Sequence, residues 1–267
     1  MLPRIKFKIL KVIIIYIYLF YLLIVEANRC FNVNNYSNDI VPKYKLIKKY
    51  SRSMKSILLM LNATTLKQCQ EFAIIRKAMA FNYYHHDNHK FNCQLLECPE
   101  INSFDSLVSD NKFFYYSMYP RKLLPERVRC LPRVGVFVIS EESKSYREAQ
   151  KSCEDINGKL AHIVSEERTQ GLAKFISNND TPVFVGLSNR RSSKEHLWKN
   201  EFDEPLNCFD YRGWNKGEPS GSRGCVGLIL TKSLISDKTP AWRVLSCSQP
   251  LPFICEVLPR VRIIKND

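Results

Sequence analysis

Two segments of the chain carry apolar residues at helical spacing. Residues 65–78 and residues 145–157 place apolar side chains three and four positions apart, which predicts an amphipathic helix in each. Gly158 stands where the C-cap of the second helix is expected. A third helix is predicted at 166–176, because Ser165 before two acidic residues is typical of a helix N-terminus.

Short apolar and aromatic runs predict strands between and after these helices. They lie at 79–84, 91–96, 113–119, 137–140 and 183–187. The first two runs flank a polar stretch at 85–90, which indicates a hairpin. Residues 188–224 show little regular pattern, and an irregular loop of that length in a compact domain is usually functional.

The first 27 residues form a targeting segment. Basic residues precede an apolar run at 12–25, and Glu26 ends the run. A membrane-spanning helix needs about 20 apolar residues, so this run is short for one. We therefore predict a cleaved signal peptide over residues 1–27 and a secreted, extracellular protein. The alternative is an uncleaved signal anchor, which would make the chain a type II membrane protein.

The cysteines and the charge fit an extracellular protein. All ten cysteines follow the targeting segment, and an even number in an oxidising compartment indicates disulfides. The formal net charge is +14, or about +11 without residues 1–27. This charge favours an anionic glycan or an acidic extracellular protein over nucleic acid. A loose basic cluster consists of Lys45, Lys48, Lys49, Arg52 and Lys55; the alternative for it is a solvated surface without a ligand.

A basic segment with two prolines at 121–132 predicts a linker between two domains. The expected order is a small disulfide-stapled α+β module at 28–120, a second α+β domain at 130–257 and a basic tail at 258–267. Both domains are long enough to bury a core of their own.

The first domain resembles the PAN/apple module. The resemblance depends on a helix cysteine, Cys69, on the Ala-Phe-Asn-Tyr run at 80–83 and on Asn92-Cys93-Gln94-Leu95. It departs from the fuller form of that family, which adds a second helix-to-strand bridge. We expect Cys69–Cys93 to fasten the helix to the sheet. Modules of this family bind proteins or glycans.

The second domain resembles the C-type lectin-like domain. The ordered motifs are Tyr146-x-x-Ala149-x-x-x-Cys153, Gly158-Lys159-Leu160-Ala161, Gly186-Leu187, Trp214-x-x-Gly217-Glu218-Pro219, Cys225, Trp242, Cys247 and Phe253-Ile254-Cys255-Glu256. Each motif is weak alone, but the ordered set is specific. The resemblance implies an α+β fold with two helices, two small sheets and a long loop.

The same resemblance implies two disulfides, Cys153–Cys255 and Cys225–Cys247. Long-form members of the family carry two cysteines before the first strand, and only Cys130 is present here. The four cysteines that remain can pair in three ways. Among these we favour Cys30–Cys98 with Cys130–Cys208.

The resemblance also locates a calcium site whose ligands are missing. Sugar-binding members hold calcium with Glu-Pro-Asn or Gln-Pro-Asp, an acidic residue before the next cysteine and Trp-Asn-Asp. Here the triplet is Glu218-Pro219-Ser220, Arg223 and Gly224 precede the cysteine, and Arg243-Val244 follow the tryptophan. Calcium prefers six to eight oxygen ligands. We expect no calcium, no other metal and no cofactor here, with Glu218 as a vestige of the site.

The long loop is the predicted binding surface. Its candidate ligand contacts are Arg190, Arg191, Arg212, Glu218, Ser220, Arg223 and Arg243. We predict a secreted recognition protein that binds an extracellular protein or an anionic glycan without calcium. The alternatives are a carbohydrate-binding lectin with residual sugar specificity and a structural protein of an extracellular matrix or cuticle. The tryptophans of the domain are interpreted as core residues.

Three further features complete the prediction. His85, His86, Asp87 and His89 could ligate a metal, but neighbouring residues on a strand point to opposite faces, so we favour an exposed turn. Glycosylation sequons begin at Asn35, Asn62 and Asn179. His162 and His196 are isolated, and no nucleophile lies in an activating motif, so we predict no enzyme.

Overall fold

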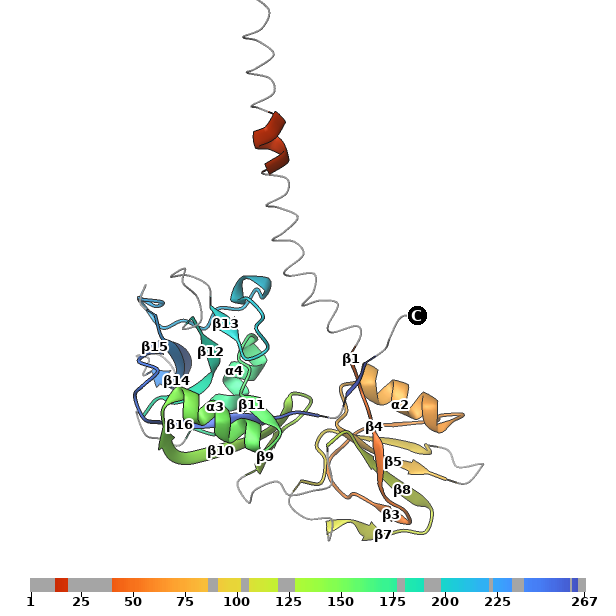
Figure 1. Cartoon of the computed structure of the whole chain (residues 1–267). Helices are drawn as coiled ribbons and strands as arrows, with labels where there is room; N and C mark the ends of the chain where they lie inside the picture. Colours follow the sequence, from red (N-terminus) through yellow and green to blue (C-terminus); the bar gives the residue numbers. More distant parts are fainter. Residues whose placement is uncertain are drawn as a thin grey trace, which may run out of the picture.

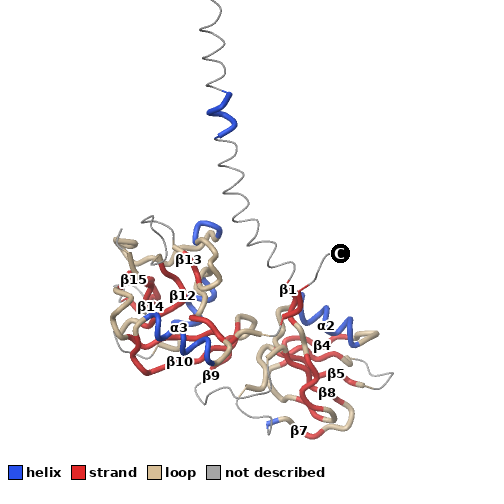
Figure 2. Tube along the Cα trace, in the orientation of Figure 1, coloured by secondary structure: helices blue, strands red, loops and turns tan. Residues whose placement is uncertain are grey.

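The computed structural model describes residues 13–18, 40–85, 91–101, 106–119, 128–176, 181–189, 198–220, 223–231, 238–259 and 261–263. Two lobes follow one another along the chain, the first from residues 40–119 and the second from residues 128–257 (Figure 1). Both combine helix with sheet, as the tube in Figure 2 shows, so the predicted α+β class is confirmed. No helix in these ranges is long and apolar enough to span a membrane.

The first lobe contains a five-stranded antiparallel sheet in the order β2-β8-β5-β6-β4. Its strands are β2 (Lys45–Lys48), β4 (Ile57–Leu61), β5 (Ala80–Tyr84), β6 (Cys93–Leu96) and β8 (Phe113–Ser117). A separate pair is formed by β3 (Ser51–Arg52) and β7 (Val108–Ser109). Strands β5 and β6 pair in antiparallel register, so the predicted pairing of these two aromatic runs is confirmed.

Helix α2 (Leu66–Ile75) packs on one face of this sheet. Thr65 caps its start by accepting a hydrogen bond from the backbone N–H of Gln68. The helix is shorter than predicted at its C-terminal end, because Lys77 adopts a left-handed backbone with a φ of 53°. Cys69 of the helix is joined to Cys93 of β6, with Cα atoms 5.7 Å apart. The structure therefore contains the expected helix-to-sheet bridge.

The other face of the sheet carries a buried polar cluster. Asn82 is fully buried; its Nδ2 donates to the backbone carbonyl of Ser53 at 2.9 Å and to Gln94 Oε1 at 3.2 Å. Asn82 Oδ1 accepts from the Ser53 N–H at 2.9 Å. The buried Glu100 carboxylate accepts from the hydroxyls of Ser53 at 2.5 Å and Ser106 at 2.8 Å. These polar groups are satisfied within the lobe, which makes their burial tolerable.

The second lobe contains an eight-stranded sheet. Its main order is β15-β14-β12-β16-β10-β9, with β11 paired to β16 and β13 to β12. The strands are β9 (Val128–Leu131), β10 (Gly135–Lys144), β11 (Gly158–Leu160), β12 (Val183–Ser188), β13 (Lys199–Asn200), β14 (Cys225–Thr231), β15 (Thr239–Leu245) and β16 (Leu251–Val257). Its α-helices are α3 (Tyr146–Asp155) and α4 (Glu166–Ala173). Its disulfides are Cys153–Cys255 and Cys225–Cys247.

Both helices of the second lobe begin at a capping serine. Ser145 forms a capping box with Glu148, and Ser165 accepts from the backbone N–H of Arg168. The predicted C-cap at Gly158 is wrong. Asn157 takes the left-handed conformation instead, with a φ of 55°, and Gly158 opens β11. A Cβ at Gly158 would lie 2.5 Å from the backbone oxygen of Glu256, so glycine is required there by strand contact.

The junction between the lobes differs from the prediction. Residues 128–131 belong to the predicted linker, yet they form β9, which pairs with β10. Cys130 in β9 forms a disulfide with Cys98 of the first lobe, with Cα atoms 6.0 Å apart. The predicted pairs Cys30–Cys98 and Cys130–Cys208 are therefore wrong. Cys208 is disulfide-bonded to a partner outside the described residues.

Further contacts connect the lobes. Tyr119, at the end of the first lobe, is buried and hydrogen-bonds to the backbone of Val136 in β10, and burial raises its pKa above the ordinary value. Strand β1 (Ile40–Pro42), near the start of the first lobe, pairs with β17 (Val261–Ile263), which follows the second lobe. The predicted basic tail at 258–267 thus contributes a strand that returns to the first lobe (Figure 1).

Candidate functional site in the long loop

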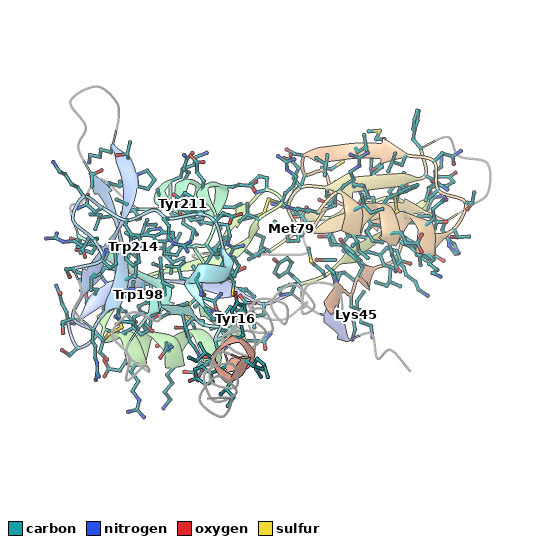
Figure 3. The ribbon with its side chains drawn as sticks, turned by 90° about the horizontal axis from the view of Figure 1, so that it is seen from above. Tyr16, Lys45, Met79, Trp198, Tyr211 and Trp214 are labelled. Atoms are coloured by element: carbon teal, nitrogen blue, oxygen red, sulfur yellow. A yellow bond between two sulfur atoms is a disulfide. The ribbon has the colours of Figure 1, made fainter. Side chains whose placement is uncertain are left out.

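An aromatic chain holds the long loop against the second lobe. The rings of Trp198, Trp214 and Trp242 follow one another, with centroids 5.0 Å and 5.4 Å apart. The Tyr211 ring lies 5.3 Å from Trp242. Trp242 is fully buried and donates its Nε1–H to Thr169 Oγ1 of α4 at 3.3 Å. Figure 3 shows Trp198, Tyr211 and Trp214 gathered in this lobe. Trp198 and Trp242 are buried and Trp214 is half-buried, which suits core residues rather than an exposed platform for a sugar ring.

Backbone hydrogen bonds fix the same part of the loop to β15. The Trp242 N–H donates to the Gly213 carbonyl at 2.6 Å, and the Asn215 N–H donates to the Trp242 carbonyl at 2.9 Å. Glycine is needed at 213, because a Cβ there would lie 2.7 Å from the indole nitrogen. The described part of the loop is therefore an ordered extension of the core.

The base of the loop is bound to helix α3 through Glu201. The Tyr146 hydroxyl donates to Glu201 Oε1 at 2.7 Å, and Gln150 Nε2 donates to Glu201 Oε2 at 2.5 Å. Lys159 Nζ donates to the Glu201 backbone carbonyl at 2.8 Å. Sequence reasoning did not identify this cluster. The residues are up to 55 positions apart, and no local motif signals their contact.

His162 is largely buried in the same region. Its Nε2 is 2.6 Å from Asn200 Nδ2 and 3.8 Å from the Glu204 carboxylate. Burial, and secondly the charge of Arg168, lowers the pKa of His162 to about 3. The imidazole is therefore neutral at neutral pH, and its contacts are those of a packed structural residue.

The residual calcium-site triplet forms a self-contained turn. The Glu218–Pro219 peptide bond is cis. Glu218 Oε2 accepts a hydrogen bond from the Ser220 N–H at 2.8 Å, and the Glu218 N–H donates to the Asn215 carbonyl at 2.9 Å. The carboxylate that resembles a calcium ligand thus stabilises its own loop.

Of the candidate arginines, the structure describes Arg212 in the loop, Arg223 just before β14 and Arg243 on β15. Arg212 is exposed, and its guanidinium donates to the carbonyls of Phe209 and Tyr211. Arg243 is exposed on β15, opposite Gly227 of β14. Arg223 lines a shallow pocket of about 540 Å³. Arg190 and Arg191 lie outside the described residues.

The Arg223 pocket lies beside the Cys225–Cys247 bridge. Its lining residues are Arg223, Gly224, Val244, Leu245, Ser246, Cys247 and Ser248. Arg223 offers a cation and the serines offer hydroxyl groups, while Val244 and Leu245 supply an apolar wall. This combination can bind a small group that carries a negative charge and hydrogen-bond acceptors. Sequence reasoning identified Arg223 but not the 244–248 wall that faces it.

The remaining candidates are only partly described. The His85 ring stacks on Phe114 with centroids 4.5 Å apart, whereas the other members of its predicted cluster lie outside the described residues. Asn62 is exposed, as a glycosylated asparagine must be. Asn35 and Asn179 also lie outside the described ranges. Within those ranges no group of three or more His, Cys, Asp or Glu residues is placed to hold a metal.

The family model of the lectin C-type domain matches residues 142–257. The second lobe is therefore a C-type lectin domain with the corresponding fold. Domains of this family bind glycans or proteins, so binding is the class of activity that it indicates.

Curated relatives match about half of this chain. The chain is 30% identical over 128 residues to Collectin-10 of Gallus gallus, covering 46% of this chain and 42% of the relative. It is 27% identical over 137 residues to C-type mannose receptor 2 of Rattus norvegicus, covering 48% of this chain and 8% of the relative. The chain thus spans less than half of either relative.

Solved structures with similar folds cover the same part of the chain. The mouse scavenger receptor C-type lectin carbohydrate-recognition domain is 25% identical, with a TM-score of 0.42, over 51% of this chain and 97% of that structure. The C-type lectin domain of murine dendritic cell inhibitory receptor 2, solved in complex with N-glycan, is 18% identical, with a TM-score of 0.43. The alignment with this structure covers 52% of this chain and 100% of that structure.

Proposed function

We propose that the protein is a secreted recognition protein whose C-type lectin domain binds an extracellular protein or an anionic glycan without calcium. The binding surface is the long-loop face, which carries Arg212, Arg223 and Arg243. The observation that carries the proposal is the replacement of acidic and amide calcium ligands by arginines next to a carboxylate that is already engaged.

Calcium fits this site poorly. Glu218 supplies one carboxylate, and one of its oxygens accepts the Ser220 N–H. Arg223 and Arg243 bring positive charge to positions where the resemblance places ligands, and both are exposed. A divalent cation needs several oxygen ligands and partial neutralisation. These residues provide neither.

The Arg223 pocket supports an anionic ligand. A guanidinium binds a carboxylate or sulfate group through charge-assisted hydrogen bonds, which are stronger than neutral ones. The hydroxyls of Ser246 and Ser248 lie in the same pocket and can bind further oxygens of the ligand. An acidic sugar or an acidic side chain of a partner protein matches this chemistry.

The other modules agree with an extracellular role. Disulfides within each lobe and between the lobes are stable in an oxidising compartment. The predicted signal peptide provides the route to it. Support for a PAN/apple-like first module comes from helix α2, which is bridged to β6 of a five-stranded sheet. Such a module would add a second binding surface.

A glycan array that includes neutral, sialylated and sulfated glycans tests the proposal. We expect binding to acidic glycans, or to none if the ligand is a protein, with the same pattern in calcium and in a chelator. The R223Q variant, compared with R147Q on the exposed surface of α3 as control, is expected to weaken binding to sialylated glycans at least tenfold. Sugar binding that disappears on chelation would overturn the proposal.

A further inference from the structure

Positive charge is concentrated in the first lobe, although the recognised binding domain is the second. Residues 40–119 include 11 basic and 6 acidic residues, a net charge of +5. Residues 128–257 include 18 basic and 16 acidic residues, a net charge of +2 over a longer segment. In the first lobe, four exposed lysines occur within seven positions at β2: Lys43, Lys45, Lys48 and Lys49.

A β-bulge aligns two of these lysines. Lys45 pairs with Ser117 of β8 and Lys48 with Tyr115, so three steps along β2 match two steps along β8. Ile47 falls at the resulting irregularity, which has the register of a bulge. Directly opposite residues share a face of the sheet, and Ser117 and Tyr115 are two apart on the same strand. Lys45 and Lys48 therefore lie on one face, which regular alternation would not allow.

Among the described residues, the lysines of this strip have no acidic partner, whereas two basic neighbours do. Arg52 forms an ion pair with Asp110 at 3.1 Å, and Lys55 lies 3.8 Å from the buried Glu100 carboxylate. In the part of the chain that the structure describes, no carboxylate lies within ion-pair distance of the four β2 lysines. Their charge is therefore available to a ligand.

Protection of a sheet edge does not explain the strip by itself. Strand β2 is one edge of the sheet, and edge lysines prevent pairing with another chain. The opposite edge, β4, has the sequence Ile-Leu-Leu-Met-Leu and carries no charge. A lobe that needed charged edges would show them on both sides. The charge is specific to β2 and continues beyond the strand at both ends.

We propose that the β2 strip, formed by Lys43, Lys45, Lys48 and Lys49, binds a sulfated polysaccharide. Residues 43–49 cover roughly 20 Å of extended chain, so the strip presents a linear row of cations that matches a linear polyanion. It lies on a different lobe from the loop tryptophans, as the position of Lys45 in Figure 3 shows. The inference does not depend on the function proposed for the lectin domain.

Binding of the full secreted chain to immobilised heparin tests the proposal. The K45Q/K48Q/K49Q variant removes three charges from the strip. The R147Q/K151Q/K174Q variant is the control, because it removes three exposed charges from the second lobe. We expect the β2 variant to bind at least tenfold more weakly at physiological salt, and the control to stay within twofold of the native chain. Salt should weaken native binding more steeply than binding of the β2 variant.

Four further measurements distinguish a sulfate-specific strip from general charge, from calcium dependence, from membrane binding and from misfolding. N-desulfated, O-desulfated heparin should bind weakly to the native chain, and a chelator should leave binding unchanged. Equal losses in the two triple variants would assign binding to overall charge and overturn the proposal. Equal or tighter binding to phosphatidylserine vesicles would assign the strip to membranes instead. K45R/K48R/K49R, which keeps the charge, should retain binding and shows that the strand tolerates substitution.

Discussion

Both lobes fasten a helix to a sheet with a disulfide, but they do so over very different lengths of chain. Cys69 and Cys93 are 24 residues apart, whereas Cys153 and Cys255 are 102 residues apart. The first lobe closes locally. In the second lobe the disulfide joins the last strand, β16, to the first helix, α3. The long loop between these two elements can therefore vary without disrupting their attachment. This difference explains why the second lobe can carry a long irregular loop.

The two lobes also bury polar groups in different ways. In the first, Asn82 and Glu100 hydrogen-bond to Ser53, next to β3, beneath a regular sheet with a charged edge. In the second, Glu201 and Trp242 attach a loop to the core. The ligand surface that we propose in the first lobe thus depends on the strand pattern, and the one that we propose in the second depends on how the loop is attached.

The largest expected effect concerns the bridges. In the chain-entropy model, C153S/C255S should lower the free energy of unfolding of the second lobe by about 4–5 kcal/mol, and C69S/C93S that of the first lobe by about 3.4 kcal/mol. All three tryptophans lie in the second lobe, so tryptophan fluorescence in urea follows that lobe and far-UV circular dichroism follows both. Equal losses of unfolding free energy in the two cysteine variants would contradict the contrast between a short-range and a long-range bridge.

Removal of the loop anchor should have the next largest effect. W242A deletes a fully buried side chain and should cost the second lobe about 3–5 kcal/mol. Its counterpart N82A leaves the backbone groups of Ser53 without partners and should cost the first lobe about 1–3 kcal/mol. Both are measured by urea unfolding. W242F keeps much of the packing and serves as control; a loss as large as that of W242A would contradict the assignment of this cost to lost packing.

A pH effect is expected in the second lobe. The native pKa of His162 is about 3, below the ordinary value of 6.5, so the unfolded chain takes up a proton first as the pH falls. The free energy of unfolding therefore falls as the pH drops from 6.5 toward 3. At pH 5 this loss amounts to about 2 kcal/mol. H162Q should reduce this loss between pH 7 and pH 5, as followed by tryptophan fluorescence. An unchanged pH dependence in H162Q would contradict the prediction.

The smallest expected effect is that of calcium on the native chain, whose melting temperature should be the same in millimolar calcium and in chelator. The S220N/R223E/R243N/V244D variant replaces the four positions that lack ligands. Calcium at ten times the Kd of this variant should raise the free energy of unfolding of the variant by about 1.4 kcal/mol. Differential scanning fluorimetry measures both. Calcium stabilisation of the native chain would show that the remaining ligands suffice.

Much of the local structure could be predicted because it depends on neighbouring residues. Ser145 and Ser165 begin helices because their hydroxyls lie within reach of free backbone N–H groups three positions on. The Cys69–Cys93 bridge follows from a helix cysteine and a strand cysteine. The positions that lack calcium ligands follow from residue type alone.

The sequence by itself determined the helix starts, the ordered lectin motifs, the loss of ligand oxygens and the excess of positive charge. The tertiary structure alone decided the Cys98–Cys130 bridge, the wall of the Arg223 pocket, the Glu201 cluster and the alignment of Lys45 with Lys48. The physical reason is that the first set depends on side-chain chemistry and local backbone geometry. The second depends on strand register and on contacts between residues far apart in the chain, which no local pattern encodes.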